Sequence, residues 1–119
     1  WPGHSRLIVD GELLRTAVPG YVLLRQFALP DGYLLITDFD CPFEESTSFV
    51  LLNAQLWVLS HRTLGGMYAS YLLKRVRWVN ERELIANFIE HGDWRLTIRA
   101  RSVPYLRPRL ALRREPGPT

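Results

Sequence analysis

The sequence predicts an all-β domain, an antiparallel meander of about eight to ten short strands that forms a sandwich or a barrel. The apolar runs are roughly five to eight residues long and rich in β-branched and aromatic residues, which favours strands over helices. Short turn segments separate these runs, so successive strands should pair antiparallel. Several runs (33–38, 48–53 and 84–90) are apolar on both faces, which indicates two packed layers or an interface between chains.

Turn residues divide the chain into strands in a regular order. Gly, Pro, Asn and Asp are typical of hairpin turns, and they bound the central runs at Leu29–Gly32, Asn53–Gln55, Asn80–Glu83 and His91–Asp93. We therefore expect strands near residues 6–9, 12–16, 21–28, 33–38, 48–53, 56–62, 70–79, 84–90, 94–101 and 105–113.

Two segments, 67–77 and 81–90, also fit a helix. Tyr68, Leu72 and Val76 lie four residues apart, as on one side of a helix, and the second segment holds good helix formers. The preceding pair of glycines offers no capping side chain, however, and the aromatic and β-branched residues favour strands. We expect strands in both segments, and helices are the alternative.

Arginines line the predicted strands near the C-terminus. In the strand 94–101, apolar side chains alternate with a face that carries Arg95, Arg99 and Arg101. In the strand 105–113, one face carries Arg107, Arg109 and Arg113. If the two strands pair, these arginines share a surface that attracts phosphate, nucleic acid or an acidic protein patch. The alternative is that the charges protect an edge strand against aggregation.

Charge is distributed unevenly along the chain, whose net charge is +3. Residues 1–60 hold three Arg against seven acids, a balance of −4, whereas residues 61–119 hold twelve bases against five acids, a balance of +7. Four acids, Asp38, Asp40, Glu44 and Glu45, cluster around the stretch 39–48, which we expect to be the longest turn. Such oxygen ligands suit a hard cation, but the spacing is not that of an EF-hand, so we predict a solvated loop and no metal site.

Three tryptophans, Trp57, Trp78 and Trp94, lie within predicted strands. Trp78 and Trp94 share faces with apolar residues, so we expect them to pack in the core. The alternative is that the aromatic rings bind a sugar or another small ligand. The sequence holds no Gly-rich phosphate loop, nucleophile elbow or paired-cysteine zinc motif, and we therefore predict neither an enzyme nor a cofactor.

A short internal similarity relates residues 29–35 to residues 79–85, at a spacing of 50. Each segment is a hairpin turn followed by an apolar strand. The spacing lies in the range of β-propeller blades, but two blades cannot close a ring by themselves. The similarity is therefore either the generic hairpin pattern or a sign that several chains assemble one propeller.

Composition completes the prediction. We expect one domain over 1–114 and a disordered tail over 115–119, which has no apolar anchor. The single cysteine, Cys41, favours a reducing compartment and hence a cytoplasmic location, and the longest uncharged stretch, 46–60, is too short to span a membrane.

We expect a non-enzymatic interaction or oligomerisation module, whose partner is another protein or a second copy. The alternatives are a sugar- or small-ligand-binding barrel or propeller-like assembly, and anion or nucleic-acid binding through the arginine-rich sheet face.

Overall fold

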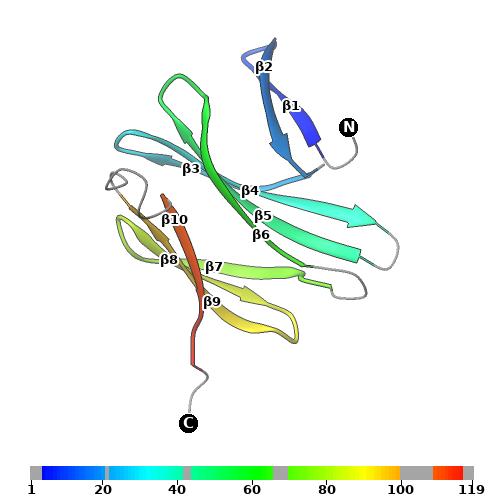
Figure 1. Cartoon of the computed structure of the whole chain (residues 1–119), viewed down its shortest axis with the longest axis vertical. Coiled ribbons are helices and arrows are strands. Elements are labelled where there is room, and N and C mark those ends of the chain that lie inside the picture. The colour runs from blue at the N-terminus through cyan, green and yellow to red at the C-terminus, as the bar shows by residue number, and fades with distance from the viewer. Residues whose placement is uncertain (1–3, 21, 42–43, 66–69, 100–108, 117–119) are drawn as a thin grey trace. The chain divides into compact units, whose positions relative to one another are not determined.

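The computed structural model describes residues 4–20, 22–41, 44–65, 70–99 and 109–116 of the chain (Figure 1). These residues form ten antiparallel strands in three sheets and contain no helix, which confirms the all-β prediction. The strands are β1 His4–Val9, β2 Glu12–Pro19, β3 Val22–Leu29, β4 Gly32–Cys41, β5 Glu44–Asn53, β6 Val58–Leu64, β7 Leu73–Asn80, β8 Glu83–Phe88, β9 Gly92–Ile98 and β10 Leu110–Arg114.

The chain divides into two compact units, residues 1–70 and residues 71–119. Unit 1 contains the hairpin β1–β2 and a four-stranded sheet in the order β3-β4-β5-β6, and unit 2 contains a four-stranded sheet in the order β10-β9-β8-β7. Neighbours in each sheet are also neighbours in the chain, which is the predicted meander (Figure 1). Each sheet ends in edge strands, so none of the three closes into a barrel within the described residues.

In unit 1 the hairpin packs as a second layer on one face of the four-stranded sheet. Its turn consists of Asp10 and Gly11, whose φ angles of 51° and 83° suit the tight turns that join twisted strands. Val18 of β2 is buried together with Leu35, Val50 and Leu52 of the sheet. The partly buried side chains around this cluster are Leu7, Leu56 and Val58. Burial of these aliphatic side chains holds the two layers together.

The two four-stranded sheets share the same connectivity. Their first hairpin turns lie 51 residues apart, at residues 30–31 between β3 and β4 and at residues 81–82 between β7 and β8, which is one residue more than the spacing of 50 noted in the sequence. Burial repeats as well: Leu34 and Leu84 are both 0% exposed, and Leu35 and Ile85 are 7% and 6% exposed. The similarity between 29–35 and 79–85 therefore extends to two equivalent meanders.

The two segments that also fitted a helix and the expected long turn all contain strands in the structure. Residues 73–80 and 83–88 are strands, so the helical alternatives are wrong. The expected long turn over 39–48 is also wrong, because β4 continues to Cys41 and pairs there with Glu44. The backbone hydrogen bonds of a ladder do not depend on side-chain type, so a hairpin in register continues through polar residues.

At the C-terminal end, Glu115 lies within the folded part of unit 2 rather than in a tail. Its backbone N–H donates to the carbonyl oxygen of Asp93 at 2.9 Å. The expected strand 105–113 corresponds to β10, and its first residues, 105–108, lie outside the described residues. The parts of the chain that the structure describes contain no helix able to cross a membrane.

Candidate anion-binding face

The pairing that would bring the predicted arginines together is present in unit 2. Strands β9 and β10 are antiparallel neighbours, and their register places Arg95 opposite Arg113. Beyond the strand ends, the backbone N–H of Arg99 donates to the carbonyl oxygen of Arg109 at 2.7 Å, and Nε of Arg109 donates to the carbonyl oxygen of Arg99 at 2.7 Å. Arg101 and Arg107, the other two predicted members, lie outside the described residues.

The remaining strands add two arginines to this face. Register places Arg77 of β7 opposite Ile85 of β8, and Ile85 opposite Arg95 of β9. With Arg113 of β10, three arginines therefore lie in one row across the four strands, on the face opposite Leu84 and Leu96. Arg75 lies in the next row, opposite Asn87.

Arg75 and Arg77 were missed although a strand was expected near 70–79, because the sequence does not show that this strand lies in the same sheet as 94–101 and 105–113. Within the strand, the alternation of Arg75, Val76, Arg77 and Trp78 places both arginines on one face. We call the six described arginines that follow this alternation the arginine face: Arg75, Arg77, Arg95, Arg99, Arg109 and Arg113.

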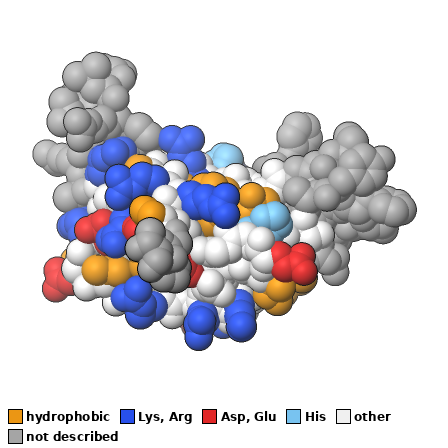
Figure 2. Space-filling model, turned by 90° about the horizontal axis from the view of Figure 1, so that it is seen from below, with side chains coloured by type: hydrophobic (Ala, Val, Ile, Leu, Met, Phe, Trp, Pro, Cys, Tyr) orange, Lys and Arg blue, Asp and Glu red, His pale blue; other side chains and the backbone are white. Residues whose placement is uncertain are grey.

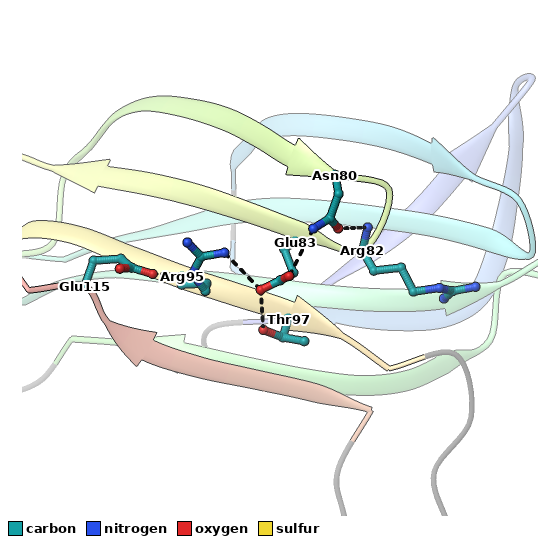
Figure 3. Close-up of polar contacts among 6 residues, drawn as sticks. All are labelled: Asn80, Arg82, Glu83, Arg95, Thr97 and Glu115. Atoms are coloured by element: carbon teal, nitrogen blue, oxygen red, sulfur yellow. Dashed lines mark hydrogen bonds and ion pairs between the residues drawn. The ribbon is translucent and has the colours of Figure 1, made fainter.

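Arg95 is held by two carboxylates, as Figure 3 shows. Its Nη1 lies 3.0 Å from Oε2 of Glu83, and its Nε donates to Oε1 of Glu115. Glu83 also accepts a hydrogen bond at 3.0 Å from Nδ2 of Asn80, whose Oδ1 in turn accepts the backbone N–H of Arg82 at 2.8 Å. The network joins β7, β8 and β9 to the residue after β10, and it fixes the guanidinium at the centre of the face.

These contacts shift the ionisation of both partners. The hydrogen bond from the Asn80 amide, followed by the contacts with Arg95, lowers the pKa of Glu83. The hydrogen bonds to Glu115 and Glu83 raise the pKa of Arg95. Arg95 is therefore a charged group whose charge is already compensated, and it acts as the fixed centre of the face rather than as a free cation.

Three arginines around this centre are exposed. The side chains of Arg75, Arg77 and Arg113 make no hydrogen bond or ion pair within the described part of the chain. Two of them, Arg75 and Arg77, line a shallow depression of about 220 Å³ together with Ile85, Asn87 and Asp93.

The charge balance of this face is positive. Its six arginines stand against three carboxylates, Glu83, Asp93 and Glu115, which gives +3. Asp93 accepts a hydrogen bond at 2.6 Å from Nδ2 of Asn87, so the face also offers polar groups already in place. In the view of Figure 2, Lys and Arg side chains form several separate blue patches, and red Asp and Glu side chains lie beside some of them.

The three predicted tryptophans are divided between the two units. Trp57 belongs to unit 1, is 68% exposed and lies in the turn before β6 rather than within a strand. Trp78 and Trp94 are partly buried on the apolar face of the unit 2 sheet, where register places them opposite Leu84 and Ala86. Trp94 also forms an edge-on ring contact with Tyr71, at 6.2 Å between centroids. These two rings therefore lie on the opposite side of the sheet from the arginine face.

Among the described residues, no group of three or more His, Cys, Asp and Glu side chains is arranged to hold a metal ion. Comparison of the chain with protein-family models, curated proteins and solved structures gave no match.

Proposed function

We propose that the protein is a non-enzymatic interaction module whose arginine face binds an acidic surface of a partner protein. The observation that carries the proposal is the set of three exposed arginines, Arg75, Arg77 and Arg113, around the fixed and compensated Arg95. Residues 71–119 hold eleven Lys and Arg against five Asp and Glu, a balance of +6, so the field of the whole unit favours an anionic partner.

The mixed chemistry of the face favours a protein over a polyphosphate chain. Carboxylates of Glu83, Asp93 and Glu115 lie among the arginines and would repel closely spaced phosphates. The shallow depression on this face instead offers the hydrogen-bonding groups of the Asn87–Asp93 pair, with the small exposed part of Ile85 beside them. Arginine beside apolar and polar groups is typical of protein interfaces, where a few such side chains supply most of the binding energy.

Binding of poly-L-glutamate, followed by fluorescence anisotropy at several salt concentrations, tests this proposal. We compare Arg75→Gln/Arg77→Gln with the control Arg15→Gln/Arg25→Gln, which removes the same charge from exposed positions of unit 1. The first pair should weaken binding by about tenfold, from two lost surface ion pairs, and the control pair by about twofold or less. Binding should also weaken as salt is raised.

Three results would contradict the proposal. Absence of binding at low salt would exclude an anion-binding face. Equal weakening by both pairs would show that net charge alone is responsible. Tighter binding of a single-stranded oligonucleotide than of poly-L-glutamate would assign the face to nucleic acid instead.

A further inference from the structure

Unit 1 contains a second surface site that is independent of the arginine face. A groove of about 450 Å³ lies between β2 and the turn that precedes β6. Its lining includes Arg15 and Thr16 of β2 and Gln55, Trp57 and Val58 of the turn and β6. From this groove we infer a binding site for a neutral sugar ring, with the indole of Trp57 as the stacking surface.

Trp57 is exposed in a way that packing does not explain. Its side chain is 68% exposed, although tryptophan offers more apolar surface for burial than any other residue. At that exposure at least one face of the indole is open to solvent. The ring face carries negative charge density, and the C–H groups on one side of a pyranose ring pack on it as a weakly polarised apolar surface.

The backbone that carries Trp57 is held in place before any ligand binds. Oδ1 of Asn53 accepts the backbone N–H groups of Gln55 at 2.9 Å and of Trp57 at 3.0 Å. The N–H of Asn53 donates to the carbonyl oxygen of Trp57 at 3.0 Å, which closes the turn. Leu56 takes a left-handed φ of 66°, and its carbonyl oxygen accepts the Thr16 hydroxyl at 2.7 Å. Such preorganisation lowers the entropic cost of binding.

The polar groups beside the indole suit hydroxyl groups. Neither the Arg15 nor the Gln55 side chain makes a hydrogen bond or an ion pair within the described part of the chain. Both ends are planar, and the amide of Gln55 offers a donor and an acceptor side by side, as neighbouring hydroxyls of a sugar require. Arg15 is the one charged residue among the described lining residues, and its guanidinium can donate to the hydroxyl oxygens of a sugar.

The test follows the indole N–H resonance of Trp57 by NMR in the whole chain, while maltotriose, cellotriose and triacetylchitotriose are added in turn. The resonance is assigned by its loss in Trp57→Phe. We expect at least one trisaccharide to shift it and to saturate below about 10 mM. Trp57→Ala should weaken binding by about tenfold or more, Trp57→Phe by less, and Gln55→Ala by about threefold.

The control is Leu59→Ala, which removes an exposed apolar side chain of β6 outside the groove and should leave the dissociation constant unchanged. Absence of any shift with all three trisaccharides would overturn the inference, as would binding that survives in Trp57→Ala. Since the site lies in unit 1, loss of sugar binding leaves the poly-L-glutamate result unaffected, and the two proposals fail separately.

Discussion

A single methyl group at residue 32 should destabilise the protein strongly, because it meets backbone rather than a side chain. Gly32 begins β4 and pairs with Leu29 of β3 on one side and Asn53 of β5 on the other. A Cβ at this position would lie 2.0 Å from the carbonyl oxygen of Leu52 and 3.0 Å from its carbonyl carbon. No change of rotamer relieves such a contact, since both partners are backbone atoms.

The cost of Gly32→Ala follows from the movement that the methyl group demands. Ordinary contact begins near 3.4 Å, so the backbone of β5 must move away from β4 by about 1.4 Å. Hydrogen bonds between strands have donor–acceptor distances of about 2.9 Å and do not survive that movement. Loss of two bonds of the β4–β5 ladder, with their buried groups left unpaired, costs about 3 kcal/mol.

Urea unfolding followed by circular dichroism measures this loss. For a slope of about 1.5 kcal/mol per molar urea, the midpoint of Gly32→Ala should fall by about 2 M. The control is Gly11→Ala, at a φ of 83° with no heavy atom within 4 Å of the added Cβ. There only the left-handed backbone is strained, at about 1 kcal/mol. If Gly11→Ala proves as costly as Gly32→Ala, backbone contact across the ladder is not what requires glycine at residue 32.

Two further predictions concern the core and the pH dependence of stability. Leu34→Ala and Leu84→Ala remove side chains that are both 0% exposed at matched positions of the two meanders, and each should lower the free energy of unfolding by about 2–5 kcal/mol in the same urea assay. A loss below about 1 kcal/mol at either position would contradict the matched burial. Because Asn80 and Arg95 lower the pKa of Glu83 below 4.5, its ionised form stabilises the fold above that pH, and this stabilisation should disappear as the pH falls through the lowered pKa. An NMR titration of the Glu83 carboxyl group measures that pKa. In Glu83→Gln, the free energy of unfolding should fall less as the pH is lowered. A pKa of Glu83 at or above 4.5 would refute the stabilising role of these contacts.

Most of the strands and the antiparallel pairing of successive strands could be predicted because the sequence signals are local, whereas the division into three sheets could not. Apolar runs with a period of two, separated by turns such as Leu29–Gly32, fix both the type of element and the antiparallel sense of its neighbours. The extension of β4 and β5 through Asp40, Cys41 and Glu44 could not be predicted from side-chain polarity, since it follows from backbone register already set farther along the hairpin. The left-handed conformation of Leu56, which delays the start of β6 to Val58, could not be predicted for a similar reason. The Leu56 N–H donates to the carbonyl oxygen of Asn53, and the Thr16 hydroxyl of a distant strand donates to the carbonyl oxygen of Leu56.

The candidate site was predictable only in part. Alternation within one strand placed Arg95 and Arg113 on a common face once β9 and β10 paired. That Arg95 is compensated by Glu83 and Glu115 depends on side chains from three different parts of unit 2, which no local pattern relates. The sequence therefore indicated where positive charge gathers but not which arginine is already paired.

The uncompensated arginines lie where charge could serve either for binding or for protection of sheet edges, and the two roles predict different results. Arg75 and Arg77 lie on β7 and Arg113 on β10, the two edge strands of the unit 2 sheet, whereas the paired Arg95 lies on the inner strand β9. If these charges serve only to prevent association between sheet edges, Arg75→Gln/Arg77→Gln should bind poly-L-glutamate as tightly as the unchanged protein does. The same variant should then associate, and its mass in light scattering should increase. Binding through the arginine face requires the opposite pair of results, a weakened complex and an unchanged mass. Arg75 and Arg77 line a depression that extends from the edge strand β7 to Ile85 on the inner strand β8. Protection of a sheet edge does not require a surface that reaches the inner strands. The depression therefore favours binding through the arginine face.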